Sequence, residues 1–480
     1  MLNKTQFYIN GTWVNSLDGR VLPVINPANE EAFATISLGG SADTIVAVAA
    51  AKAAFPSWSK TSPDERRSHL VNLLEVYKAR NEEMATAIST EMGAPMDMAI
   101  RDQVGAGIGH LKAFITGLEG IRFLRPLRTG LEGQDVAFEA AGVAALITPW
   151  NWPMNQVVLK VGAALAAGCT MVLKPSEIAP MSGILFAEMV HEAGIPAGVF
   201  NMLNGDGAGA GSILSAHPDV DVVSFTGSTR AGILIGQAAA ATIKRVSLEL
   251  GGKSPNLVFA DCDIEEAVRR SAKACFNNTG QSCNAGTRLL VEKSAYAQAV
   301  EVAGKAAEDT KVDLPSKSGT HIGPLVSQAQ FDKVQSLIKA GIDEGATLVA
   351  GGLGRPEGLN RGWFVKPTVF ADTTPDMTII REEIFGPVLS IMSFDSEDQA
   401  IALANDTPYG LAAYIQTGNM DRARRVTPQL RAGMVQINGA LRTSGSPFGG
   451  YKQSGLGREG GMWGIEEFLE IKSISGFTSN

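Results

Sequence analysis

The chain has 480 residues, of which 45% are hydrophobic and 19% charged, and it carries a net charge of −8. This length exceeds one ordinary core and predicts two or three domains of about 100 to 200 residues each. Acidic and basic residues are interspersed, which excludes a basic stripe for nucleic acid and a polybasic patch for a membrane. We therefore expect small molecules and copies of the same chain as partners.

The start of the chain, MLNKTQFYING, is polar and lacks the apolar run of a signal peptide. The longest apolar stretch, between Val157 and Leu173, is interrupted by Lys160 and by glycines, so no membrane span is expected. The four cysteines form no C-x-x-C pair, and the five histidines are scattered singly. These features predict a cytoplasmic protein with reduced thiols and no metal site.

Short β-rich runs alternate with helix-length segments between residues 143 and 250. The segment before them, from about 122 to 141, lacks clear helical periodicity and contains TGLEGQD, which predicts a hairpin turn. The predicted strands are VAALITP, TMVLKP, VFNMLN, DVVSFTG and RVSLEL, and the predicted helices are MNQVVLKVGAALAAG, about Met181 to Ala193, and Thr229 to about Ala241. This β-α-β rhythm is typical of a parallel, doubly wound sheet.

A second alternating region runs from Asn256 to about Gly433 and includes the strand-like runs VLSIMSF and AAYIQT. It predicts a second α/β domain. The C-terminal EEFLEIKSISG alternates apolar and polar residues and predicts an edge strand. Such strands commonly pair with another subunit.

Two stretches are candidates for binding a dinucleotide phosphate. GLGREG (455–460) matches G-x-G-x-x-G, but no apolar strand precedes it, so we reject it. In SFTGSTRAG, Gly227 and Gly232 flank a turn between a strand and a helix. Backbone amides and the Ser228 hydroxyl at that helix N-terminus could hold a pyrophosphate. The alternative is that these glycines are purely structural.

LKPSE (173–177) follows the apolar run TMV, at the position where ligands bind in open parallel sheets. Glu177 could accept hydrogen bonds from both hydroxyls of a ribose, and Lys174 could donate to the same sugar. The alternative is an exposed ion pair that caps the following helix.

NNTGQSCNAGTR (277–288) places Cys283 among polar residues and glycines. Free cysteines are mostly small buried hydrophobes, and this stretch offers no apolar place to bury one. A reactive thiol, in contrast, must be accessible and polarised, which such a loop permits. The alternative for any cysteine is an incidental surface position, which we prefer for Cys262, or buried packing, which we prefer for Cys169 and Cys275.

Seven motifs occur in one order along the chain: ITPWNWP (147–153), LKPSE (173–177), FTGST (225–229), ELGGKSP (249–255), GQSC (280–283), EEIFGPV (382–388) and PFGGYKQSG (447–455). With them the chain resembles the NAD(P)-dependent aldehyde dehydrogenase superfamily over essentially its whole length. The resemblance implies an α/β, aldehyde dehydrogenase-like fold with two Rossmann-like doubly wound parallel-sheet domains and a small β oligomerisation arm.

The resemblance also implies domain boundaries that cover most of the chain. Residues 1–121 and 142–251 would form the dinucleotide-binding domain, and residues 252–445 the catalytic domain. Residues 122–141 and 465–480 would form the oligomerisation arm. Relatives are commonly homodimers or homotetramers, and the sequence does not choose between them.

The resemblance also implies a covalent mechanism. Cys283 matches the nucleophile, whose attack converts the aldehyde into an alkoxide that can expel hydride and collapse to a thioester. Asn151 matches the oxyanion donor that acts together with the backbone N–H of Cys283. Glu249 matches the general base that activates water, and Lys160 and Glu459 match positions proposed to relay protons.

Each of these residues also has a plainer interpretation. Asn151 could be a turn former between two tryptophans, and Glu249 could cap a helix or form a salt bridge. Lys160 and Glu459 could be structural charges.

The cofactor contacts implied by the resemblance fall into two groups. Glu383 and Phe385 match contacts to the nicotinamide ribose. The other matching positions are Ile147, Thr148, Trp150, Lys174, Ser176, Glu177, Gly207, Phe225, Thr226, Gly227, Ser228 and Leu250. The carboxylate of Glu177 favours NAD because it would repel a 2′-phosphate, although NADP stays possible.

The positions that match the aldehyde tunnel are mostly apolar or aromatic. They are Trp152, Met154, Leu159, Ser282, Asn284 and Phe448, and they suit medium-length aliphatic or aromatic aldehydes. Leu159 stands where many relatives carry an aromatic residue, which predicts a roomier site. Arg442 lies in the loop expected at the tunnel mouth, where it could accept a remote carboxylate on the substrate. The alternative is an exposed arginine with no substrate role.

Three functions remain in competition. The first is a hydrolytic aldehyde dehydrogenase that releases a free acid. The second is an acylating relative that passes the thioester to coenzyme A, and Glu249 counts against it. The third is a non-catalytic binding or structural relative, which the joint presence of Asn151, Glu249 and Cys283 opposes.

Overall fold

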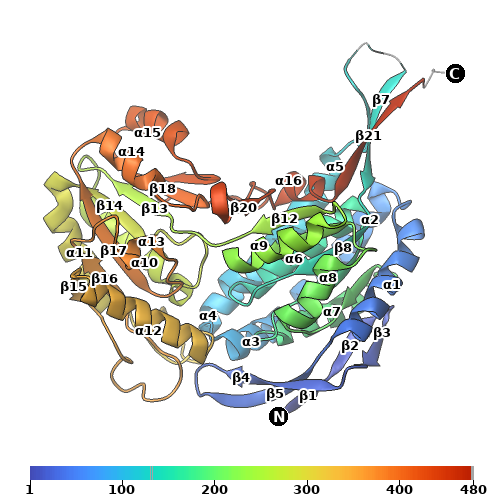
Figure 1. Cartoon of the computed structure of the whole chain (residues 1–480), viewed down its shortest axis with the longest axis horizontal. Helices are drawn as coiled ribbons and strands as arrows, with labels where there is room; N and C mark the ends of the chain where they lie inside the picture. Colours follow the sequence, from blue (N-terminus) through green and yellow to red (C-terminus); the bar gives the residue numbers. More distant parts are fainter. Residues whose placement is uncertain (130, 132, 477–480) are drawn as a thin grey trace.

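The computed structural model describes residues 1–129, 131 and 133–476. Two large sheets lie side by side, and a narrow arm projects from the body (Figure 1). Within the described residues the larger sheet has eight strands in the order β20-β12-β11-β8-β9-β10-β2-β3. Its centre is a parallel array of β8 (Val143–Ile147), β9 (Thr170–Lys174), β10 (Phe200–Met202), β11 (Val222–Thr226) and β12 (Arg245–Glu249). All five strands predicted for this region are confirmed.

The order of these five strands contains one reversal. β8, β9 and β10 follow one another in a single direction, whereas β11 pairs with the opposite side of β8 and β12 continues from it. In open parallel sheets, ligands bind outside the carboxyl ends of the strands at such a reversal. The predicted helices that connect the strands are confirmed as α6 (Pro153–Ala167), α7 (Met181–Glu192) and α9 (Thr229–Ala240).

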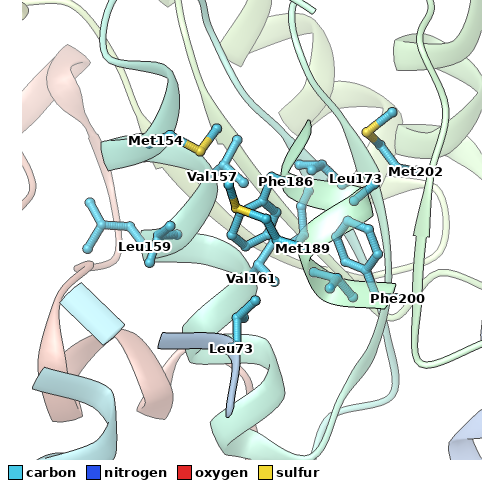
Figure 2. Packing of buried hydrophobic residues seen from close by; sticks show 14 of the residues in the cluster. Leu73, Met154, Val157, Leu159, Val161, Leu173, Phe186, Met189, Phe200 and Met202 are labelled. Atoms are coloured by element: carbon cyan, nitrogen blue, oxygen red, sulfur yellow. The ribbon is translucent and has the colours of Figure 1, made fainter. Parts of the chain in front are cut away.

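Both faces of this sheet are covered by hydrophobic side chains. Successive residues of a strand point to opposite faces, and Ala144 and Leu146 accordingly belong to one core cluster, whereas Ala145 and Ile147 belong to another. Figure 2 shows side chains of α6 and α7, with Phe200 of β10, packed together in the first cluster. Each fully buried side chain of this size contributes about 1.5 to 3 kcal/mol. The sheet is therefore doubly wound, as predicted.

The second sheet has the order β15-β16-β17-β14-β13-β18-β19, and its neighbours are parallel except at β15 and β16. Helices α10 and α11 cover one face, and α14 and α15 the other. The second α/β domain is thus confirmed. Its elements are β13 (Pro255–Val258), α10 (Ile264–Phe276), β14 (Arg288–Glu292), α11 (Tyr296–Glu308), α12 (Gln328–Asp343), β15 (Thr347–Ala350), β16 (Thr368–Ala371), α13 (Thr378–Arg381), β17 (Val388–Phe394), α14 (Glu397–Asn405), β18 (Ala412–Gln416), α15 (Met420–Val426) and β19 (Met434–Ile437).

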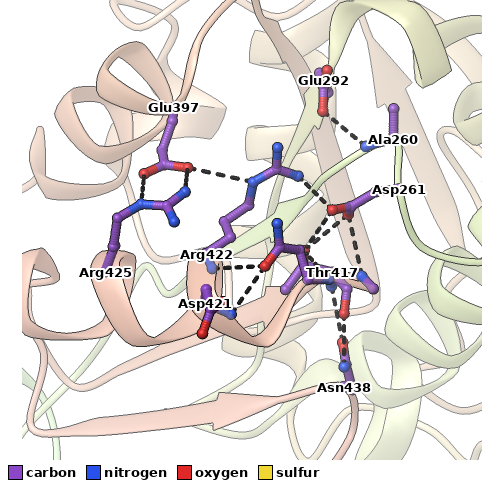
Figure 3. A network of polar contacts seen from close by, with 11 residues as sticks. Ala260, Asp261, Glu292, Glu397, Thr417, Asp421, Arg422, Arg425 and Asn438 are labelled. Atoms are coloured by element: carbon purple, nitrogen blue, oxygen red, sulfur yellow. Dashed lines mark hydrogen bonds and ion pairs between the residues drawn. The ribbon is translucent and has the colours of Figure 1, made fainter.

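A polar network closes one end of this second sheet (Figure 3). Asp261, just after β13, accepts hydrogen bonds from Thr417 Oγ1 at 2.9 Å and from Arg422 Nη1 at 2.8 Å. The Arg422 guanidinium also lies 3.3 Å from a carboxylate oxygen of Glu397 and stacks on the ring of Phe259. A multiply bonded arginine of this kind fixes α14 and α15 against the strands.

The projecting arm is a three-stranded antiparallel sheet in the order β21-β7-β6. Its strands are β6 (Leu124–Pro126), β7 (Gln134–Ala140) and β21 (Leu469–Ser475). The predicted C-terminal edge strand is confirmed, because β21 pairs only with β7 in the part of the chain that the structure describes. The predicted turn TGLEGQD includes positions 130 and 132, which lie outside the described residues. Pairing of β21 with another subunit stays a prediction.

The first 38 residues form strands that the sequence analysis did not assign. β1 (Leu2–Lys4), β4 (Arg20–Asn26) and β5 (Glu31–Leu38) build a separate small sheet, and β2 (Gln6–Ile9) and β3 (Thr12–Asn15) extend the large one. The remaining helices and strand are α1 (Ser41–Trp58), α2 (Pro63–Ala79), α3 (Asn81–Met92), α4 (Met96–Met98), α5 (Gly105–Gly120), α8 (Ser212–Ala216), β20 (Gly455–Leu456) and α16 (Gly461–Glu466). None of the described helices combines the length and apolarity that crossing a bilayer requires.

A buried carboxylate holds the start of α7. Glu91 of α3 is fully buried, and its two oxygens accept hydrogen bonds from the backbone N–H groups of Met181 at 2.5 Å and Ser182 at 3.1 Å. Pro180, the residue before the helix, makes no side-chain cap. Glu91 therefore satisfies donors that a helix N-terminus leaves free. Burial raises the pKa of Glu91 to about 7 in spite of these bonds.

We predict that Glu91→Ala lowers the free energy of unfolding by about 2 to 4 kcal/mol, because it leaves two buried backbone donors without an acceptor. Denaturant unfolding followed by circular dichroism measures this loss. The matched control is Glu82→Ala, an exposed glutamate on the same helix, which should change stability by no more than about 0.5 kcal/mol. Equal effects of the two substitutions would contradict the assignment.

Candidate active site

Ten of the predicted site residues meet in one cavity of about 230 Å³ at the reversal of the first sheet. Cys283, Asn151 and Glu249 all line it. The predicted cofactor residues that line it are Trp150, Thr226, Gly227, Ser228, Leu250, Glu383 and Phe385. The cavity therefore joins the carboxyl ends of the parallel strands to the loop that carries the cysteine.

The other predicted cofactor residues lie farther along the same edge. Ile147 is in register with Lys174 of β9 and with Phe225 of β11, so three neighbouring strands end together. The backbone N–H of Thr148 donates to the carbonyl of Lys174 at 3.1 Å. Ser176, Glu177 and Gly207 lie in the adjoining segments after β9 and β10. This second group does not line the cavity of Cys283 but continues from it.

Lys174 and Glu177 are not the exposed helix-capping pair that we considered as an alternative. Lys174 is 3% exposed, and its Nζ donates to the carbonyls of Gly205 at 2.7 Å and Pro175 at 3.0 Å. Its distance to the nearer carboxylate oxygen of Glu177 is 3.4 Å. Helix α7 begins only at Met181, so neither Lys174 nor Glu177 caps it. Burial lowers the pKa of Lys174, and the nearby carboxylate of Glu177 opposes that shift.

SFTGSTRAG forms the strand, turn and helix that the sequence predicted. Ser228 is the N-cap of α9, and its hydroxyl accepts from the backbone N–H of Ala231 at 3.3 Å. The hydroxyl Oγ1 of Thr226 is buried and has no hydrogen-bond partner within the described residues. GLGREG, in contrast, lies in the short strand β20 and the loop after it, antiparallel to β12.

The segment before Cys283 adopts an unusual backbone. Asn278, Thr279 and Gly280 have φ values of 52°, 56° and 71°, in the left-handed region. For non-glycine residues, and above all for a β-branched one, this conformation costs about 1 to 3 kcal/mol each. Asn278 Nδ2 donates to the carbonyl of Asn151 at 2.9 Å, and Thr279 Oγ1 donates to the carbonyl of Gly323 at 3.0 Å. These bonds hold the strained turn.

Asn151 is tied directly to the cysteine loop. Its side-chain Nδ2 donates to the carbonyl of Gln281 at 3.0 Å, and Gln103 Nε2 donates to the carbonyl of Asn151 at 3.1 Å. The neighbouring Trp152 donates from its indole N–H to Ser282 Oγ at 2.8 Å. The amide of Asn151 is therefore oriented by the residues just before the thiol and is more than a turn former.

The thiol of Cys283 is half-buried and packs against a small cluster that contains Phe448. Burial, followed by the carboxylates of Glu383 and Glu249, raises the pKa of Cys283. The sequence predicted an accessible, polarised thiol, whereas the thiol in the structure is more protected from solvent. The chain also approaches the backbone of Cys283 closely at Gly252, where an added Cβ would lie 2.5 Å from the carbonyl oxygen of Cys283.

The remaining thiols have ordinary environments. Cys169 and Cys275 are buried, as predicted. Cys262 is half-buried against the core under α10 and α11, whereas the sequence suggested a surface position.

Glu249 is the last residue of β12 and is 2% exposed. Neither of its carboxylate oxygens has a hydrogen-bond partner in the described chain, so it is neither a helix cap nor part of a salt bridge there. Burial, followed by the negative charge of Glu459, raises the pKa of Glu249 well above its usual value, while Lys160 and Arg458 oppose the shift. Gly449 touches this carboxylate, since an added Cβ would lie 2.5 Å from Oε1.

Lys160 and Glu459 form a fully buried ion pair behind Glu249. Lys160 Nζ also donates to Ser224 Oγ at 3.0 Å. The pair links α6 to the loop after β20, so both residues have a structural contact in addition to their proximity to the candidate base.

The predicted substrate residues are divided between a cavity and the core. A cavity of about 380 Å³ is lined by Trp152, Ser282 and Asn284, and also by Arg270 and Tyr414. Polar side chains also line it, although most of its wall is apolar. Met154 and Leu159 are buried in the first core cluster, where Leu159 points away from the other labelled side chains (Figure 2). Arg442 is exposed and stacks on Phe448.

The sequence analysis missed several residues that build the site. Asn278 and Gln281 stand within the polar stretch that was singled out, so their amides were a usable signal. Gln330 and Lys333 line the cavity of Cys283 from α12, and Gln330 Nε2 donates to the carbonyl of Phe385 at 2.8 Å. Nothing in the sequence around that surface helix indicates such a contact.

Two Rossmann-like domains that meet at a cysteine, an asparagine and a glutamate define an aldehyde dehydrogenase architecture. The chain belongs to the aldehyde dehydrogenase family, whose model matches residues 13–474.

The chain is 50% identical to a 3-succinoylsemialdehyde-pyridine dehydrogenase of a Pseudomonas species, covering 99% of each chain. A crystal structure of an aldehyde dehydrogenase from Bartonella henselae superposes with a TM-score of 0.98 at 55% identity, covering 99% of this chain and 100% of that one. A mutant of aldehyde dehydrogenase C from Pseudomonas syringae, in complex with NAD+ and octanal, superposes with a TM-score of 0.97 at 47% identity, covering 99% and 97%.

We predict that Lys160→Met lowers the free energy of unfolding by about 3 to 5 kcal/mol, because it leaves the carboxylate of Glu459 buried without its counter-charge. The double variant Lys160→Met/Glu459→Leu removes both charges and should recover most of this loss. Denaturant unfolding of both variants measures the difference. A single variant that is as stable as the double variant would show that the pair carries no buried charge.

Proposed function

We propose that this aldehyde dehydrogenase oxidises an aldehyde to the free carboxylic acid with NAD+ as its oxidant. The proposal depends chiefly on one observation: Cys283, Asn151 and Glu249 line the same cavity as the N-terminus of α9. NADP stays the alternative cofactor. We also propose the domain division 1–121 with 142–251, 252–445, and 122–141 with 465–480, in which the arm joins subunits through β21.

The residues at the reversal of the sheet fit a dinucleotide. The unpartnered Thr226 hydroxyl and the N-terminus of α9 offer donors to a pyrophosphate. Glu177 offers a carboxylate to ribose hydroxyls, and its negative charge would repel a 2′-phosphate, which supports NAD. When bound, NAD+ supplies the acceptor for the hydride that leaves the aldehyde carbon.

In the proposed mechanism, Cys283 Sγ forms a bond to the aldehyde carbon as the thiol passes its proton to water. The side-chain amide of Asn151 and the backbone N–H of Cys283 donate to the resulting alkoxide. Loss of hydride from the carbon then leaves a thioester on Cys283. Asn151 keeps one amide hydrogen for this task, because the other is held by the carbonyl of Gln281.

Glu249 would act in the second half of the reaction. Its carboxylate takes a proton from a water molecule, the hydroxide attacks the thioester carbon, and the carbon–sulfur bond breaks to release the acid. A buried carboxylate with a raised pKa is a stronger base than an exposed one. Lys160 and Glu459 lie next to it and would carry the proton onward.

The test is NADH formation with a panel of aldehydes, with and without coenzyme A. We predict that Cys283→Ala abolishes turnover, whereas Glu249→Gln keeps a rapid burst of about one NADH per site and loses roughly 10²- to 10⁴-fold in steady-state rate. Acceleration of the wild type by coenzyme A, with acyl-coenzyme A as product, would favour the acylating alternative. Full turnover by Cys283→Ala in a contaminant-free preparation would overturn the proposal.

The pH dependence of deacylation gives a separate prediction. Since only the ionised carboxylate can accept a proton, kcat should rise with pH through the raised pKa of Glu249. Glu459→Gln removes the second-largest cause of that raised pKa, so the rising limb should move to lower pH. Steady-state kcat measured across the acidic and neutral range checks this shift. If the rising limb of the kcat–pH profile stays in place, or moves to higher pH, the negative charge of Glu459 does not raise the pKa of Glu249.

A further inference from the structure

The cavity beside the cysteine loop is lined in part by the segment that directly precedes Arg442. Ser282 and Asn284, the neighbours of the thiol, line the cavity of about 380 Å³, and so do Ala440 and Leu441. Arg442 follows directly. The loop after β19 therefore forms part of the wall of this cavity, and Arg442 stands at its border.

Phe448 connects the arginine to the thiol. The guanidinium carbon of Arg442 lies 4.9 Å from the centroid of the Phe448 ring. Phe448 belongs to the same small cluster against which Cys283 and Tyr414 pack. An aldehyde held at Cys283 and extended along Phe448 would thus bring its far end to the guanidinium.

The hydrogen-bonding capacity of Arg442 is largely unused. One N–H donates to the carbonyl of Ser446 at 3.1 Å. Among the ion pairs of the described residues, none involves Arg442, whereas the three arginines of α15 each pair with a carboxylate. A guanidinium has five donors and stays charged at all ordinary pH values. Four donors therefore remain for a ligand.

Helix α5 lies against the same loop. Gly109 of α5 touches the loop, since an added Cβ would lie 2.5 Å from Ser444 Oγ. The next residue, His110, has its Nε2 2.8 Å from Asn155 Oδ1, and its Nδ1 is buried without a partner in the described structure. Burial lowers the pKa of His110, and the positive charge of Arg442 acts in the same direction. Arg270, which lines the cavity, pairs with Glu266, whereas Arg442 has no carboxylate partner within the described residues.

We propose that Arg442 binds the carboxylate at the far end of an ω-carboxylated aldehyde, so that the enzyme prefers semialdehydes of dicarboxylic acids to plain aldehydes of equal length. This inference rests on the proposed function and narrows its substrate class. A planar guanidinium pairs with a carboxylate through two parallel hydrogen bonds, which gives both orientation and affinity.

The kinetic test compares matched substrates in the complete enzyme. The pairs are butanal with succinate semialdehyde, and pentanal with glutarate semialdehyde. Wild type should have the higher kcat/KM for the carboxylated member of at least one pair. Arg442→Ala should lose about 10- to 100-fold for that substrate and keep its kcat/KM for the plain aldehyde, because the lost interaction is a charge-assisted bond. For the carboxylated aldehyde, the kcat/KM of Arg442→Lys should lie between those of the wild type and of Arg442→Ala.

The matched control is Arg431→Ala, which removes another arginine stacked on an aromatic ring, Tyr451, outside this cavity. It should change kcat/KM for neither the plain nor the carboxylated aldehydes. If Arg442→Ala lowers kcat/KM equally for plain and carboxylated aldehydes, or for neither, the arginine has only a packing role and the proposal is wrong.

Binding of a product analogue separates this proposal from the proposed function. In the Cys283→Ala background, calorimetry should detect glutarate, and the additional substitution Arg442→Ala should weaken that binding by about 10-fold or more. If glutarate binding depends on Arg442 but no aldehyde yields NADH, the proposed function fails and the carboxylate site stands. If aldehydes are oxidised but glutarate binding does not change on Arg442→Ala, the proposed function stands and only the proposed carboxylate site is wrong.

Discussion

The structure depends on a small set of hydrogen bonds that joins the two α/β domains at the cysteine loop. Asn151 follows strand β8 of one domain, and residues 278 to 283 follow helix α10 of the other. The amide of Asn151 donates to Gln281, and Asn278 donates back to the carbonyl of Asn151. Without these bonds the left-handed turn before Cys283 would lack the support that offsets its strain. The cavity exists because this junction holds.

Burial then sets the charge state of the groups at that junction. Glu249 lies at a strand end with no partner for its oxygens in the described chain, and its neighbour Glu459 is compensated by Lys160. A low-dielectric surrounding disfavours an ionised carboxylate and strengthens the effect of each nearby charge. The same burial protects the thiol of Cys283. Burial therefore raises the pKa of both Glu249 and Cys283.

The two sides of Cys283 differ in chemistry. The cofactor side combines backbone donors at the start of α9 with carboxylates, which suits a molecule with phosphates and sugars. The cavity beside Ser282 and Asn284 combines aromatic rings with amides, and Arg442 lies on the adjoining loop, stacked on Phe448. An aromatic ring beneath a guanidinium holds its position without consuming its donors. Arg442 can thus be ordered and still available to a ligand.

The sequence by itself determined the elements whose physical signal is local. Central strands such as β8 and β9 are buried on both faces and read as continuous apolar runs, so they could be predicted, as could the helices between them. The short N-terminal strands could not, because they are partly exposed and gain their stability from distant partners such as β10. The motif residues Cys283, Asn151 and Glu249 were identified by resemblance, and the structure placed them in one cavity.

Only the tertiary structure decided which of these groups are buried, paired or strained. Lys174 looked like an exposed partner of Glu177, but distant carbonyls surround its ammonium group. Glu91 carried no signal in the sequence, because the donors that it satisfies lie 90 residues away in α7. Thr279 gave no hint of a left-handed backbone, since a contact with Gly323 supports it. Burial, ion pairing and backbone strain arise from contacts between segments far apart in the chain, and a local pattern does not contain them.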